Sequence, residues 1–124
     1  FIHQSRRVRK VLGGGMRQAG MLAAAGIYAL DYHLDKLKED HEKAKEIANV
    51  LANCGWVKSV IPCQTNIIVV ELNDNVDQMK ILDKLKSKGL LTIGFGVGKI
   101  RFVTHLNISN AMVEDAKQIL KTLI

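Results

Sequence analysis

A triple glycine between cationic side chains is the segment whose residue types point most directly to chemistry. Gly13-Gly14-Gly15 follows Arg9 and Lys10 and precedes Arg17. Glycine reaches positive φ and lets the backbone approach a ligand closely, and a helix that begins after it presents free N–H groups and a positive dipole end. The run therefore predicts an anion site, with a simple linker into the helix as the alternative.

The placement of charge agrees with this prediction. The chain has 124 residues and a net charge of +6. Five cationic residues and no acidic one precede Asp31, whereas the chain from Asp31 onward holds 13 lysines and arginines against 12 acids. A nucleic-acid track would spread its charge over a broad face with interleaved aromatics. The pattern instead favours a local anion pocket, with a solvated basic helix end as the alternative.

Composition predicts one compact domain with an ordinary core. The two cysteines, Cys54 and Cys63, lack a CxxC pattern and are expected as free thiols of a reducing compartment, the cytoplasm. We expect no metal site, because metal-ligand spacings are lacking. No stretch approaches the roughly 20 consecutive apolar residues of a membrane span. Phe1 stands where an initiator methionine would, so we expect the chain to be a piece of a longer protein.

Apolar spacing predicts one long or kinked helix over residues 16–52, which Asn53-Cys54-Gly55 ends. Its first half carries a surface of small residues, Gly20 and 23–26, that another helix or subunit can approach closely. After this helix the pattern predicts a strand, a short helix, two strands that pair as a hairpin, and a last helix capped by Ser109 or Asn110. These elements span residues 65–72, 76–89, 90–95, 99–105 and 110–123.

The predicted fold class is α+β. A long N-terminal helix precedes a small βαββα domain, with a mostly antiparallel three-stranded sheet and helices on one face. This order alone would also suit a non-catalytic βαββα module that binds a small anionic metabolite or RNA.

Two motifs resemble low-specificity threonine aldolases, which are pyridoxal-phosphate enzymes of fold type I. Residues 10–26 contain Gly-Gly-Gly-Met-Arg-Gln-Ala-Gly and end Met-Leu-Ala-Ala-Ala-Gly. Residues 99–109, Lys-Ile-Arg-Phe-Val-Thr-His-Leu-Asn-Ile-Ser, are similar to the R-x-V-T-H-x-D-V-S block of that family. The resemblance covers essentially the whole chain. It implies that residues 1–15 end a missing large domain and that residues 16–124 form the small domain with its connecting helix.

The resemblance also implies roles for three cations. Arg101 would bind the substrate carboxylate through two charge-assisted hydrogen bonds, and its apolar neighbours make an unpaired guanidinium costly. A salt bridge at a strand edge is the alternative. Arg17 would reach the phosphate of pyridoxal phosphate from the neighbouring subunit, and Lys10 would support it. Apart from the resemblance, His105 follows Arg101 by four positions, and on an extended strand an even offset puts both on one face. It would line the site or satisfy a core hydrogen bond, and we favour structural support.

The implied reaction is cleavage of L-threonine or L-allo-threonine to glycine and acetaldehyde. The chain supplies no catalytic residue, because the lysine that would hold the cofactor is expected upstream of Phe1, and alone it should not cleave substrate. The implied partners are the missing large domain, the amino-acid substrate and further copies in a dimer of dimers, with no nucleic acid and no membrane. The small domain of another fold type I lyase or transaminase is a further alternative.

Overall fold

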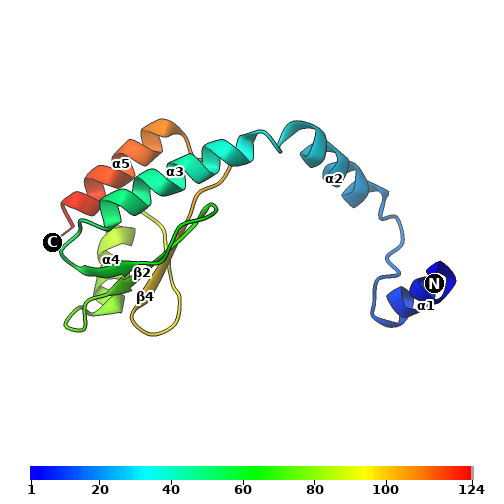
Figure 1. Cartoon of the computed structure of the whole chain (residues 1–124), viewed down its shortest axis with the longest axis horizontal. Helices are drawn as coiled ribbons and strands as arrows, with labels where there is room; N and C mark the ends of the chain where they lie inside the picture. The colour runs from blue at the N-terminus through cyan, green and yellow to red at the C-terminus, as the bar shows by residue number, and fades with distance from the viewer. Residues whose placement is uncertain (124) are drawn as a thin grey trace. The chain divides into compact units, whose positions relative to one another are not determined.

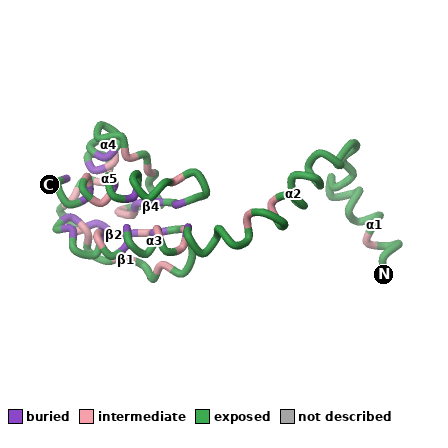
Figure 2. Tube along the Cα trace, turned by 90° about the horizontal axis from the view of Figure 1, so that it is seen from above, coloured by how far each residue is buried: buried purple, intermediate pink, exposed green. Residues whose placement is uncertain are grey.

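The computed structural model describes residues 1–123 and divides the chain into two compact units, Phe1–Leu34 and Asp35–Ile124. The first unit holds two helices, α1 at Ile2–Val11 and α2 at Gly20–Tyr32. Neither helix has a buried residue, and Figure 2 shows both in the colours of exposed and intermediate positions. The unit therefore lacks a core of its own.

Helix α1 was not predicted, because Phe1 offers no side chain to cap it and no capping bond is formed. The residues between its ends include three arginines and a lysine, all good helix formers. Most of the basic, glycine-rich segment of residues 1–15 is thus helical.

The long helix expected over residues 16–52 is two helices. Gln18 has a positive φ of 52°, so α2 begins only at Gly20, and a turn at residues 33–35 separates it from α3 at Lys36–Leu51. Asp31, Tyr32 and His33 rank low in helix propensity, and no buried contact of α2 compensates for them. The first buried residue of the chain is Asp40 of α3, so the turn at residues 33–35 lies before the core begins.

The second unit is built on a four-stranded antiparallel sheet with the strand order β1-β2-β4-β3 (Figure 1). Its strands are β1 at Val57–Val60, β2 at Ile67–Leu72, β3 at Ile93–Gly94 and β4 at Lys99–Val103. The α+β class and the β3–β4 hairpin are confirmed. Strand β1 was not predicted, because it is four residues long and has no alternation of buried and exposed positions.

One face of the sheet carries the core. Ile68, Val70 and Leu72 of β2 alternate with partly exposed residues, as do Ile100 and Phe102 of β4. The core also includes buried side chains of three helices: α3, α4 at Gln78–Ser87 and α5 at Asn110–Lys121. The buried segments in Figure 2 accordingly lie within this unit. The helices that share this core lie on one face of the sheet, as predicted. The other face of the sheet is not part of the core.

Caps and side-chain bonds position the elements of this unit. Ser109 caps α5, as expected, by accepting a hydrogen bond from the Met112 N–H. Asp77 caps α4 by accepting hydrogen bonds from the N–H groups of residues 79 and 80. The Thr104 hydroxyl donates to the Asp40 carbonyl at 2.7 Å and so ties α3 to the end of β4.

Candidate functional site

Arg101 lies on the sheet face opposite the core. Its backbone pairs with Val69 of β2 on one side and Ile93 of β3 on the other. The Thr92 hydroxyl donates to the Arg101 carbonyl at 2.6 Å. Because side chains alternate along a strand, burial of Ile100 and Phe102 directs Arg101 to the outer face. A central strand thus holds the guanidinium outside the core at a fixed backbone position.

The guanidinium of Arg101 has no acidic partner. Among residues 1–123 it forms no ion pair, and its buried Nε has no hydrogen-bond partner. Its Cζ lies 5.5 Å from the centre of the Phe95 ring, within the range of a cation–π contact. The salt bridge considered for the strand edge is therefore not formed in the described chain, and the donors of Arg101 remain available for an anion.

Glu71 is an acidic side chain on the same face, and it is already occupied. One carboxylate oxygen lies 3.0 Å from Lys99 Nζ, and the other accepts from the Ser59 hydroxyl at 2.8 Å. Hydrogen bonds from Lys99 and Ser59, in that order, hold the pKa of Glu71 below its usual value. In the β2–β4 register Glu71 is opposite Lys99, one diagonal from Arg101. Because both oxygens of the Glu71 carboxylate have these partners, the carboxylate does not pair with the Arg101 guanidinium.

The glycine run ends a helix instead of introducing one. Gly13 has a φ of +83°, its N–H donates to the Lys10 carbonyl, and the Gly14 N–H donates to the Arg9 carbonyl at 2.8 Å. These two bonds form a Schellman motif at the end of α1. A Cβ at Gly14 would lie 3.0 Å from the Arg9 carbonyl oxygen. The expectation that a helix N-terminus follows the glycines directly is wrong.

Lys10 and Arg17 belong to the first unit, Lys10 in the last turn of α1 and Arg17 in the turn before α2. Both are exposed and form no ion pair with residues 1–123. Arg101 belongs to the second unit. The anion-binding roles of all three remain predictions.

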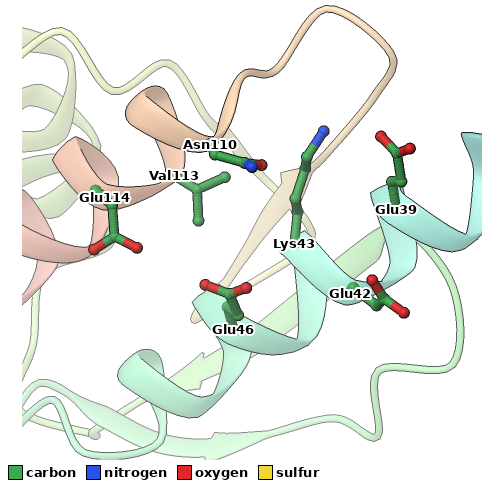
Figure 3. A pocket seen from close by; sticks show the side chains of 7 residues that line it. All are labelled: Glu39, Glu42, Lys43, Glu46, Asn110, Val113 and Glu114. Carbon is green, nitrogen blue, oxygen red and sulfur yellow. The ribbon is translucent and has the colours of Figure 1, made fainter.

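A cavity of about 290 Å³ between α3 and α5 does not suit an anion. Figure 3 shows four glutamates around it, with one lysine, one asparagine and one valine. The lysine, Lys43, donates to the Ile108 carbonyl at 2.9 Å instead of pairing with these acids. Ion pairs join Glu42 to Lys38 and both Glu46 and Glu114 to Lys117, so no lysine there is left to bind a phosphate or a carboxylate. The residues that line it are Glu39, Glu42, Lys43, Glu46, Asn110, Val113 and Glu114.

His105 lies beyond the end of β4, so the argument that it shares a strand face with Arg101 does not hold. Its Nδ1 accepts from the Asn107 N–H at 3.3 Å, and its carbonyl accepts from the Ile108 N–H at 2.8 Å. Both bonds shape the turn that leads to α5. This arrangement fits the structural support that we favoured.

Sequence reasoning missed Phe95 and Glu71 beside Arg101. The strand containing Glu71 was predicted, but a single sequence does not give the register that sets it opposite Lys99. For Phe95, the flanking Gly94 and Gly96 mark a hairpin turn whose aromatic residue must lie near β4. That glycine-flanked aromatic was the available signal.

Among residues 1–123, no three His, Cys, Asp or Glu side chains gather where they could hold a metal ion. Both cysteines are free thiols, and burial raises the pKa of Cys54. None of the helices in this range is both long and apolar enough to span a membrane.

Comparison with known proteins decides the family. The model of the beta-eliminating lyases matches residues 1–75, more than half of the chain. The chain belongs to the beta-eliminating lyase family. The matched residues include the glycine run, helices α2 and α3, and strands β1 and β2.

Curated relatives confirm the resemblance to low-specificity threonine aldolases. Low-specificity L-threonine aldolase 1 of Arabidopsis thaliana is 38% identical over 116 residues, which cover 91% of this chain and 32% of the relative. The Escherichia coli K12 low specificity L-threonine aldolase is 35% identical over 115 residues, 93% of this chain and 33% of that protein. The chain therefore spans about a third of the length of these relatives.

Solved structures confirm the fold of this family member. The ornithine aminotransferase of Toxoplasma gondii ME49 matches with a TM-score of 0.61 over 72% of this chain and 23% of its own, at 21% identity. The histidinol-phosphate aminotransferase of Clostridium acetobutylicum gives 0.53 over 64% and 25%, at 20% identity. At these identities the likeness shows the fold alone.

Proposed function

We propose that the chain is the C-terminal portion of a pyridoxal-phosphate enzyme that cleaves L-threonine or L-allo-threonine to glycine and acetaldehyde. One observation carries the choice of reaction: threonine aldolases match nearly the whole chain at 38% and 35% identity. The aminotransferases share only the fold, at 20–21% identity. This contrast favours an aldolase over a transaminase or a non-catalytic binding module.

Arg101 supplies the substrate anchor in this proposal. Its donors are not engaged by an acid of the described chain, because Lys99 and Ser59 hold the carboxylate of Glu71. A guanidinium binds a carboxylate through two parallel N–H···O bonds, which fix both position and orientation. Fixing the substrate carboxylate sets which bond to the α-carbon is aligned for cleavage.

The first unit has a donor set that fits a phosphate. Lys10 and Arg17 are exposed, have no ion-pair partner in the described chain, and lie in a segment without any acid before Asp31. We propose that Arg17 binds the cofactor phosphate from a neighbouring subunit and that Lys10 supports it. Pyridoxal phosphate, when bound, supplies an electron-withdrawing ring that stabilises negative charge at the substrate α-carbon.

The remaining parts of the enzyme lie outside this chain in the proposal. A large domain that ends at residues 1–15 would carry the cofactor lysine, and residues 16–124 would form the small domain. Helix α2 buries no residue within the chain, which fits a helix whose packing partners are elsewhere in the protein. We propose a cytoplasmic dimer of dimers that acts on a small amino acid and binds neither nucleic acid nor membrane.

The test is the reaction of the intact enzyme loaded with pyridoxal phosphate. L-threonine and L-allo-threonine are supplied separately, and acetaldehyde and glycine are measured over time. We expect both products in equal amounts from each substrate. Transfer of the amino group to an added 2-oxo acid, without acetaldehyde, would contradict the proposal and favour a transaminase.

A further inference from the structure

We infer that Phe95 is a positioning residue for Arg101 and that Gln78 holds the turn on which Phe95 lies. The inference rests on the proposed function, because it deepens the role of Arg101 as the substrate anchor. It concerns the β3–β4 hairpin, residues 93–103, and the first turn of α4.

The Phe95 ring is placed for the guanidinium and not for the core. Its residue is 48% exposed and is absent from the core cluster, yet the ring centre lies 5.5 Å from Arg101 Cζ. A cation–π contact uses the face of the ring and takes none of the five guanidinium N–H donors as an acid would. Phe95 therefore restrains the side chain of Arg101 while its donors stay available for a carboxylate.

Restraint matters because arginine is long and loses rotamer freedom when it binds. Ordering a side chain of this kind on association costs conformational free energy. A guanidinium already held beside a ring has lost part of that freedom before substrate arrives. The buried Nε of Arg101 has no hydrogen-bond partner in residues 1–123, and the contact described for its guanidinium is the one with the Phe95 ring.

Gln78 fixes the turn that carries Phe95. Its side-chain NH₂ group donates to the Gly96 carbonyl at 3.0 Å and to the Lys99 carbonyl at 2.7 Å. Its carbonyl oxygen accepts from the Gly98 N–H at 3.2 Å. One amide thus satisfies three backbone groups of the turn that follows Phe95.

The glycines of this turn allow the backbone geometry and the close approach that the Gln78 side-chain amide requires. Gly96 and Gly98 have φ values of +81° and +66°, which other residues rarely adopt. A Cβ at Gly94 would lie 2.8 Å from the Gln78 side-chain nitrogen. The Phe95 N–H itself donates to the Lys99 carbonyl at 2.8 Å. The glycine spacing and Gln78 together hold the backbone of Phe95 in one place beside β4.

The experiment uses the intact, cofactor-loaded enzyme and two measurements, kcat/KM for L-threonine and the dissociation constant of the product glycine. Phe95→Leu should weaken glycine binding and lower kcat/KM by about 5- to 20-fold, with kcat changing less than KM. Phe95→Tyr keeps the ring and should restore most of the loss. Val97→Ala, in the same turn and almost fully exposed, is the matched control and should change neither value.

A double-mutant cycle separates positioning from general support. In an Arg101→Lys background, Phe95→Leu should add less than about a twofold loss, because the group that it positions has gone. Gln78→Met should lower kcat/KM to a similar extent as Phe95→Leu and add little to it. Gln78→Met also serves as the second variant if Phe95→Leu does not fold.

Three outcomes would overturn the inference, and the first is distinguishable from the other two. No acetaldehyde from the wild-type enzyme would overturn the proposed function and this inference with it. Wild-type cleavage together with equal glycine binding by Phe95→Leu and Phe95→Tyr would overturn the inference alone. So would an equal loss from Phe95→Leu in the wild-type and Arg101→Lys backgrounds.

Discussion

The two units of the chain place their cations by different means. In the first unit, α1 and α2 bury nothing, and Lys10 and Arg17 lie on exposed segments next to a helix end or a turn. In the second unit, Arg101 lies on a central strand above a core shared by three helices. Arg101 is held in position by its own unit, whereas the cations of the first unit lack such support.

This contrast explains why an anion site can be proposed with different detail in each unit. For Arg101 the structure gives the strand register, the ring beside it and the network that occupies Glu71. For Lys10 and Arg17 it gives charge, exposure and the helix end produced by the glycines. A phosphate site in the first unit therefore depends on the surfaces that α1 and α2 contact in the intact enzyme.

The largest expected effect compares matched leucines in the two units. Leu85 is fully buried in α4, whereas Leu30 of α2 is 62% exposed. Leu85→Ala should lower the free energy of unfolding of this chain by about 2–5 kcal/mol, because it leaves a cavity in the core. Leu30→Ala should change it by less than about 0.5 kcal/mol. Urea unfolding measures both, and equal losses would contradict the contrast between the units.

The next effect tests the phosphate site. Arg17→Ala in the intact enzyme should raise the dissociation constant of pyridoxal phosphate by about 10-fold, the loss of one charge-assisted hydrogen bond. Arg6→Ala removes an exposed arginine of the same segment and should change it by less than twofold. Cofactor titration followed by absorbance gives both constants. Unchanged retention in Arg17→Ala would return that residue to the class of solvated arginines.

A smaller effect concerns the end of α1. Gly13 adopts a left-handed φ, so Gly13→Ala should destabilise that helix end by about 1 kcal/mol. Gly15 has no positive φ and only an ordinary contact at its Cβ position, which makes Gly15→Ala the control. Far-UV circular dichroism should show a loss of helix for the first variant alone. Equal spectra for the two would contradict the Schellman motif.

The smallest effect is the pH dependence at Glu71. Because Lys99 and Ser59 lower its pKa in the folded state, Glu71 stabilises the fold fully above its unfolded pKa of about 4.3. That stabilisation is lost as the pH falls through the lower folded value. Glu71→Gln should therefore lose stability less steeply between about pH 5 and 3. Urea unfolding across this range checks the slope, and a slope equal to the wild type would contradict the network.

Periodicity predicted the parts of the fold that have a clear hydrophobic face. The last helix, expected over residues 110–123, is confirmed at Asn110–Lys121, with Val113, Ala116 and Leu120 all buried. The sequence did not indicate β1, because a four-residue strand of half-buried positions carries no such pattern. The expectation that a helix begins directly after the glycine run was also wrong, since glycine suits the end of one helix as well as the approach to the next.

The candidate site likewise has one part that the sequence predicted and one part that it did not. Arg101 could be singled out because a charged residue inside an apolar strand is costly and needs a reason. The surroundings of Arg101 could not be predicted from the sequence. The contacts of Phe95 and Gln78 come from the geometry of the hairpin, and the pairing of Glu71 comes from the strand register. These depend on contacts between residues that are distant in sequence. Motif resemblance led to the reaction, and structure supplied the environment of its anchor.

The most direct test of the account is Arg101→Lys in the intact enzyme, with kcat/KM for L-threonine as the measurement. Lysine keeps the charge but lacks the planar fork, so we predict a loss of more than about 100-fold while pyridoxal-phosphate retention stays unchanged. Arg6→Lys is the matched control and should keep wild-type kinetics. A loss of less than about 100-fold for Arg101→Lys would contradict carboxylate anchoring by Arg101.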